Sequence, residues 1–156
     1  MLDYRPKDVH DILLVSSTAL GDTVLSTAAM AAVRQSFPEA RITALIHRDY
    51  APLFRQCDFL DEVIAYHGGW RRFFTTLRAL RRTPPDLALI LHGNEPQATP
   101  LAYLAGARFI FKLPNTTRFA FLLSNQEPRL TWRDFSHGID ARLGVCLLYT
   151  SDAADE

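Results

Sequence analysis

The stretch DILLVSSTALGDTVLSTAAMAAV, residues 11 to 33, predicts a strand, a turn and a long helix. DILLV is a short apolar run with a β-branched residue, which is typical of a β-strand. A helix is expected over residues 21–36, because apolar residues follow almost without interruption and Pro38 would end it. With so little polar face, this helix should be buried on more than one side. Asp22 is the one acid in the turn between the two elements.

The alternation of strand and helix continues along the chain. Further strands are expected at residues 41–46, 61–66, 86–91 and 107–111, and further helices at 50–56, 70–82, 97–106 and 136–143. The alternation predicts an α/β fold, a doubly wound, Rossmann-like parallel sheet with right-handed crossovers and the strand order 3-2-1-4-5. In such sheets ligands bind beyond the carboxyl ends of the strands, near the switch between the first and fourth strands. Those ends carry the loops 16–22 and 92–95.

Composition narrows the function classes. The 156 residues suggest one domain, and 48% hydrophobic with 22% charged residues are typical of a soluble globular protein. The polar N-terminus lacks the apolar core of a secretory signal, so a cytoplasmic location is expected. Two cysteines and five scattered histidines favour neither a disulfide framework nor a metal site, and no cofactor is expected. Basic residues are few and lack an aromatic stacking pattern, so no nucleic acid partner is expected.

The last eleven residues, CLLYTSDAADE (146–156), look foreign to the chain. They fit neither a helix nor a strand ending, and they back-translate to a string that resembles a transposase adapter of sequencing libraries. The natural chain is therefore expected to stop near Val145, with residues 146–156 as an adapter-derived tail. A disordered acidic tail is the alternative. Without the three acids of this tail, the net charge changes from zero to +3.

Asp22 has two interpretations. As a helix cap, it would accept N–H bonds from the first turn and be stabilised by the helix dipole. As a general base, it would take a proton from an attacking sugar hydroxyl, although the dipole weakens a carboxylate as a base. A base must also aim its carboxylate into the cleft rather than onto its own backbone.

The other candidate residues are of types that can bind an anion. STALGD has one glycine, Gly21, and therefore lacks the G-x-G-x-x-G dinucleotide fingerprint. Ser16, Ser17 and Thr18 could contact a phosphate or a sugar at the helix N-terminus, or could simply satisfy the turn. In helix 70–82, five apolar residues share one face: Trp70, Phe73, Phe74, Leu77 and Leu80. Its arginines are typical of a solvated face, but Arg71 and Arg72 also suit a carboxylate or phosphate.

The segments ILLVSSTALGDTVLSTAAMAAVRQSFPEARITALI, APLFRQCDFLDEVIAY, PPDLALILHGN and FSHGIDARLGV, in this order, resemble glycosyltransferase family 9. These are the lipopolysaccharide heptosyltransferases, and the resemblance covers about residues 11 to 145. It implies a two-lobed GT-B fold of which residues 1–145 are the N-terminal, acceptor-binding lobe. The C-terminal lobe, which binds the nucleotide-sugar donor, commonly ADP-heptose, is missing from this chain.

The resemblance also implies roles for individual residues. The aspartate of the family's Gly-Asp pair is the proposed base and matches Asp22. The acceptor, a lipopolysaccharide core or lipid A, carries anions that basic residues near the ends of the third and fifth strands hold. The counterparts that the resemblance suggests for these basic residues are Arg71, Arg72, Lys112 and Arg118. We also assign Ser17, Thr18, Gly21, His92 and Asn94 to acceptor binding, and the alternative for His92 is a plain loop histidine at a strand end.

The implied reaction is a direct displacement with inversion, in which Asp22 deprotonates an acceptor hydroxyl as the nucleoside diphosphate leaves. The resemblance suggests no metal, no further cofactor and a location on or near the cytoplasmic face of the inner membrane. Without a donor lobe, this chain should be inactive by itself. Two alternatives remain, a phosphate-binding α/β module without chemistry and a structural or signalling domain of flavodoxin-like shape.

Overall fold

A computed structural model describes residues 5–92, 97–112, 119–124 and 132–150 of the chain. Five parallel strands form one sheet in the order β3-β2-β1-β4-β5, as the sequence predicts. The strands are β1 (Asp11–Ser16), β2 (Arg41–His47), β3 (Glu62–Tyr66), β4 (Leu87–His92) and β5 (Phe109–Lys112). The doubly wound, Rossmann-like α/β fold is therefore confirmed.

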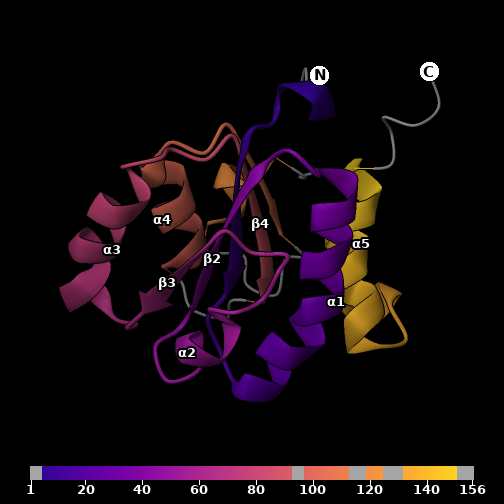
Figure 1. Cartoon of the computed structure of the whole chain (residues 1–156), viewed down its shortest axis with the longest axis horizontal. Coiled ribbons are helices and arrows are strands. Elements are labelled where there is room, and N and C mark those ends of the chain that lie inside the picture. Colours follow the sequence, from indigo (N-terminus) through magenta and orange to yellow (C-terminus); the bar gives the residue numbers. More distant parts are fainter. Residues whose placement is uncertain (1–4, 93–96, 113–118, 125–131, 151–156) are drawn as a thin grey trace.

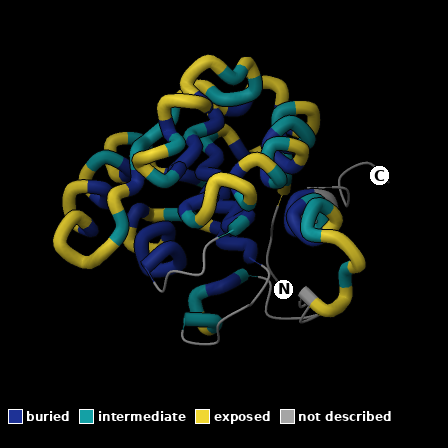
Figure 2. Tube along the Cα trace, turned by 90° about the horizontal axis from the view of Figure 1, so that it is seen from below, coloured by how far each residue is buried: buried dark blue, intermediate teal, exposed yellow. Residues whose placement is uncertain are grey.

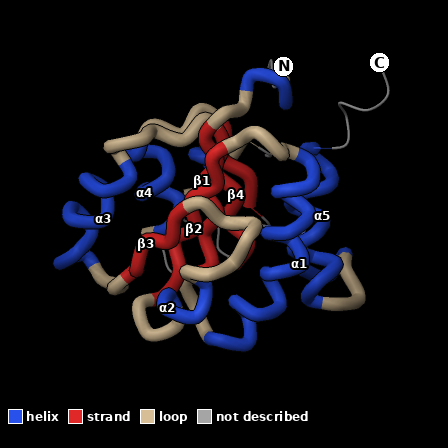
Figure 3. Tube along the Cα trace, viewed as in Figure 1, coloured by secondary structure: helices blue, strands red, loops and turns tan. Residues whose placement is uncertain are grey.

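Helices cover both faces of this sheet. The helices are α1 (Leu20–Ser36), α2 (Ala51–Phe54), α3 (Phe73–Leu80), α4 (Ala98–Ala105) and α5 (Gly138–Thr150), and short 3-10 turns include η2 (Trp70–Arg72) and η3 (Ala120–Leu122). The helices α1 and α5 lie on one side of the sheet and α3 and α4 on the other (Figures 1 and 3). Right-handed crossovers from a parallel sheet produce this two-sided arrangement.

Side-chain alternation along the strands builds two separate cores. In β1, Ile12 and Leu14 pack with α1, α2 and α5, whereas Leu13 and Val15 pack with α3 and α4. Successive side chains of a strand point to opposite faces, so a strand covered on both sides must be apolar throughout. Figure 2 shows the resulting buried centre in dark blue, with exposed residues on the outside.

The helix α1 is buried on two sides but not on the third. It packs against the sheet and against α5, which agrees with the expectation from its apolar sequence. Its remaining side carries Val24, which is 52% exposed, and Leu20 at its start. The apolar sequence of α1 therefore predicted more burial than the described residues provide.

Two expectations about helices are wrong. Trp70 and Phe74 do not join the buried face of α3, although Phe73, Leu77 and Leu80 do. Residues 70–72 form a 3-10 turn with a different side-chain rotation, and Phe74 lies about 100° around the helix from Phe73. Exposed aromatic rings consequently remain on the outer side of α3.

The second error concerns the end of the chain. The helix α5 continues through residues 146–150, which we expected to form neither helix nor strand. The reason is periodicity, because Ala141, Val145 and Cys146 recur on one helix face and are all buried against α1 and the sheet. Burial also raises the pKa of the Cys146 thiol to about 12. The proposed adapter origin of this segment stays a prediction.

Candidate functional site

The carboxylate of Asp22 lies where β1 and β4 end, at the point of the sheet at which the strand order switches. Asp22 belongs to the first turn of α1, and Ala19 is the residue before that helix. The side chain of Ala19 cannot cap, and no hydrogen bond among the described residues joins the Asp22 carboxylate to a backbone N–H. The cap interpretation is therefore wrong for this structure, and the carboxylate is aimed at other side chains.

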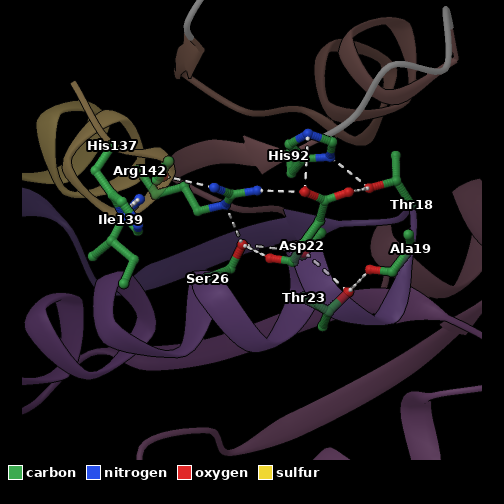
Figure 4. A network of polar contacts seen from close by, with 11 residues as sticks. Thr18, Ala19, Asp22, Thr23, Ser26, His92, His137, Ile139 and Arg142 are labelled. Atoms are coloured by element: carbon green, nitrogen blue, oxygen red, sulfur yellow. Dashed lines mark hydrogen bonds and ion pairs between the residues drawn. The ribbon is translucent and has the colours of Figure 1, made fainter. Parts of the chain in front are cut away.

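Arg142 of α5 makes the shortest contact with that carboxylate. Its Nη2 donates to Asp22 Oδ1 at 2.8 Å, its Nε donates to Ser26 Oγ at 3.1 Å and its Nη1 donates to the Gly138 carbonyl at 2.6 Å. The Arg142 side chain is only 2% exposed, whereas that of Asp22 is 32% exposed. Burial lowers the pKa of Arg142, and the charge and hydrogen bond of Asp22 oppose this shift. A buried guanidinium thus fixes one oxygen of a carboxylate that solvent can still reach (Figure 4).

His92, the last residue of β4, faces the same carboxylate. Its Nε2 lies 3.6 Å from Asp22 Oδ1, and its Nδ1 lies 2.5 Å from Thr18 Oγ1 (Figure 4). Thr18 Oγ1 is also 3.3 Å from Asp22 Oδ2. The Thr18 hydroxyl donates to Asp22 Oδ2, and which atom donates in its contact with Nδ1 depends on the imidazole tautomer.

Burial and two nearby positive charges favour the neutral form of His92. Burial lowers the pKa of His92 below its ordinary value of 6.5, and the positive charges of Arg142 and Lys112 lower it further. The negative charge of Asp22 opposes this effect. The neutral imidazole is therefore the favoured form of His92 at neutral pH.

Local structure explains how His92 reaches this position. The register of β1 and β4 shifts between Val15 and Ser16, so that Ser16 lies opposite His92. The amide of Ser17 then donates to the His92 carbonyl at 3.1 Å and extends the pairing. Bulges of this kind re-aim a side chain at the end of a strand.

Three buried hydroxyl groups, beneath the side chains of Asp22 and Arg142, hydrogen-bond to the same network. Ser16 Oγ contacts Thr23 Oγ1 and Ser26 Oγ, each at 3.3 Å, and Ser26 Oγ donates to the Asp22 carbonyl at 2.8 Å. Ser16, Thr23 and Ser26 are each fully buried. These hydroxyl groups form hydrogen bonds with one another and with Arg142 Nε. Their hydrogen-bonding capacity is therefore used although they are buried next to the apolar core.

The other predicted site residues differ in how close they come to Asp22. Thr18 and His92 contact it, and Gly21 leaves open space beside it, since an added Cβ would meet no atom within 4 Å. Ser17 is buried, and its hydroxyl makes no hydrogen bond within the described part of the chain. Lys112 is buried at the end of β5, and this burial lowers its pKa.

The remaining predicted residues lie apart from the network or outside the description. Arg71 and Arg72 follow β3, which is two strands away from β1, roughly 10 Å at ordinary strand spacing. Arg72 Nη1 instead contacts His67 Nδ1 at 3.0 Å. Asn94 and Arg118 lie outside the described residues.

Sequence reasoning missed Arg142, although FSHGIDARLGV was quoted for the family resemblance. Arg142 lies 120 residues from Asp22, so no local pattern connects the two. A weak signal existed, because Arg142 interrupts the apolar face that Ala141, Val145 and Cys146 form. An arginine on a buried helix face needs a partner of opposite charge.

No metal site appears in the described part of the chain, which holds no cluster of three or more metal-ligating side chains. No described helix is long and apolar enough to cross a membrane. A cavity of about 230 Å³, lined in part by Thr43, Glu62 and Arg82, lies at the amino ends of the strands. It is thus at the opposite edge of the sheet from Asp22.

Comparison with solved structures gives relatives of the same fold. A glycosyl transferase family 9 protein from Veillonella parvula superposes with a TM-score of 0.70 at 22% identity, over 94% of this chain and 42% of the other. The E. coli heptosyltransferase WaaC with ADP-2-deoxy-2-fluoro heptose gives 0.67 at 13% identity, over 90% and 48% of the two chains. E. coli ADP-heptose lps heptosyltransferase II gives 0.54 at 23% identity, over 64% and 29%.

The similarity to these solved proteins lies in the fold, because the sequence identities are low. No protein-family model matches the sequence, and no curated protein matches it either. The chain spans less than half the length of each of the three solved proteins. Its fold is therefore that of one part of glycosyltransferases of the heptosyltransferase kind.

Proposed function

We propose that this chain is the acceptor-binding lobe of an inverting glycosyltransferase of family 9, with Asp22 as the general base. The observation that carries the proposal is the Asp22 carboxylate itself, which is held at the switch point of the sheet and partly open to solvent. Solved heptosyltransferases with the same fold support it, and one of them binds an ADP-heptose analogue. The full enzyme would transfer a sugar, heptose from ADP-heptose, to a lipopolysaccharide core or lipid A acceptor.

Each member of the network has a role in this proposal. Arg142 holds Oδ1 of Asp22, so Oδ2 is the oxygen that would accept the proton of an acceptor hydroxyl. The hydroxyl oxygen then forms a bond to the anomeric carbon while the bond to the nucleoside diphosphate breaks. His92 Nε2 faces Asp22 Oδ1 across 3.6 Å, and the lowered pKa of His92 favours a neutral imidazole there. The donor lobe must supply the diphosphate contacts, so the chain by itself is inactive.

The substitution Asp22→Asn in the full-length enzyme tests the base. Loss of a general base typically costs about 10²- to 10⁴-fold in rate, so turnover should fall at least about 100-fold while the acceptor KM changes little. The structure adds a complication, because Asn leaves the buried Arg142 without a counter-charge and should lower the melting temperature. Turnover must therefore be measured well below that temperature.

Arg142→Met provides the matched control. It keeps the carboxylate, so it should retain far more turnover than Asp22→Asn. The double variant removes both charges, and it should regain stability relative to Asp22→Asn without regaining turnover. If Asp22→Asn retains turnover within about 10-fold of the parent enzyme, Asp22 is not the base.

A further inference from the structure

The outer side of α3 and of the preceding turn η2 carries large aromatic rings in contact with solvent. Trp70 is 56% exposed and Phe74 is 75% exposed. Both flank the buried ring of Phe73, with centroid distances of 5.2 Å from Trp70 and 5.7 Å from Phe74. The two exposed rings therefore both pack against the ring of Phe73.

Arginines surround these rings. Arg78 lies four residues after Phe74, so these two share one side of α3, and Arg71 precedes them in the turn η2, next to Trp70. Both arginines are exposed, and no ion pair joins either of them to an acid in the described part of the chain. We call Trp70, Arg71, Phe74 and Arg78 the α3 patch.

The charge of this segment is unbalanced. Residues 67–85 contain five arginines and no acid. The nearest acids in sequence have other partners, since Glu62 pairs with Arg41 at 2.8 Å and Asp86 accepts the amides of residues 10 and 11. The α3 patch is therefore apolar at its centre and positive at its rim.

From this combination we propose that the α3 patch docks onto an anionic phospholipid surface. Trp and Phe rings partition into the boundary between headgroups and acyl chains, and arginines beside them attract anionic headgroups. A protein partner would need matching acids for the arginines and an apolar pocket for the rings, whereas a bilayer supplies both without a specific fit. The proposal requires no catalytic activity and stands or falls independently of Asp22.

The patch also has a favourable position. It begins at the carboxyl end of β3, the same edge of the sheet that carries Asp22. It lies across the sheet from α5, so a surface bound there leaves the Arg142 contact undisturbed (Figure 1).

Vesicle binding tests the proposal on the chain of 156 residues. The probes are unilamellar vesicles of phosphatidylcholine alone and of phosphatidylcholine with one quarter phosphatidylglycerol, each at low and at high salt. The chain should co-sediment with the anionic vesicles at low salt and bind much less to the neutral ones. In a Trp132→Phe background, Trp70 is the sole tryptophan and its fluorescence should shift to the blue on binding.

Variants of the patch make the test specific. Arg71→Gln with Arg78→Gln should weaken binding to anionic vesicles by on the order of 10-fold, and Trp70→Ser with Phe74→Ser should do the same. Leu53→Ser and Lys7→Gln alter one exposed apolar residue and one exposed basic residue elsewhere and should leave binding unchanged. Circular dichroism of each variant establishes that it is folded, and Asp22→Asn should bind vesicles as the parent chain does.

Several outcomes would overturn the proposal. One is the absence of vesicle binding by the folded chain, and another is binding that the patch variants leave unchanged. Equal affinity for single-stranded oligonucleotides would mark the patch as a general polyanion site instead. A dimer that forms without lipid and that the patch variants abolish would mark it as a contact between copies of the chain.

Discussion

The arginines of α5 and of the α3 patch differ in burial and in their partners. Arg142 is buried, hydrogen-bonded on three sides and committed to one carboxylate. Arg71 and Arg78 are exposed and leave their charge to the solvent. A buried guanidinium must have matched partners, because the cost of removing its charge from water is otherwise too high, whereas an exposed one keeps its hydration. Arg142 can therefore position a reacting group, while the α3 arginines can attract a distant surface.

Removal of the buried arginine should have the largest effect on stability. Arg142→Met leaves the Asp22 carboxylate unpaired, and loss of one partner of a buried pair costs about 3–5 kcal/mol. Because Asp22 is 32% exposed, we expect about 2–3 kcal/mol here, which corresponds to roughly 4–12 °C in the melting temperature of a domain of this size. Thermal unfolding followed by circular dichroism measures the change.

Arg108→Met is the matched control for an exposed arginine. Arg108 lies 3.9 Å from Asp86 and 5.8 Å from the centroid of the Phe109 ring, and its side chain is 58% exposed. Its loss should therefore cost less than about 0.5 kcal/mol. Equal effects of the two substitutions would show that Arg142 is not buried as the structure has it.

The pKa of His92 should depend on the charges of the same network, with a smaller effect on stability than the loss of Arg142. Its pKa in the folded chain is lowered below 6.5 by burial and by Arg142 and Lys112. Above pH 6.5 both folded and unfolded chains hold a neutral His92, so it contributes no pH dependence there. As the pH falls below 6.5, the unfolded chain binds the proton first and stability declines, until the folded pKa is passed.

NMR titration of the His92 ring protons measures this pKa directly. Arg142→Met removes a neighbouring positive charge and should raise the pKa, whereas Asp22→Asn removes the negative charge and should lower it. Shifts in the same direction for both variants would contradict the arrangement of charges around the imidazole.

A smaller effect than that of Arg142→Met is expected from Gly138→Ala. A Cβ at this position would lie 2.9 Å from Arg142 Nη1, so the guanidinium must move slightly to make room. The end of a flexible side chain can shift, and we expect a change in stability of less than about 1 kcal/mol. The His92 pKa should nonetheless move towards its value in Arg142→Met. An unchanged His92 titration would show that the guanidinium position is not critical.

The sequence could predict those parts of the candidate site whose residues are close along the chain or lie at the ends of neighbouring strands. Thr18 and Asp22 are close because a short turn joins β1 to α1, and His92 follows from the order of the strands. Arg142 was not predictable, since it reaches Asp22 only when α5 packs against α1. Arg71 and Arg72 suited an anion by composition, but β2 separates β3 from β1, and no contact in the described residues joins them to Asp22.

The sequence by itself determined the α/β fold, the order of five strands and the place of Asp22 at the switch point. Hydrophobic periodicity is a local property, and handed crossovers leave few ways to arrange the elements that it specifies. Only the tertiary structure decided that the Asp22 carboxylate faces Arg142 and His92 instead of capping its own helix. Only it decided that Trp70 and Phe74 stay on the surface. Burial and pairing depend on which elements pack together, and neighbours far apart in the chain set that packing.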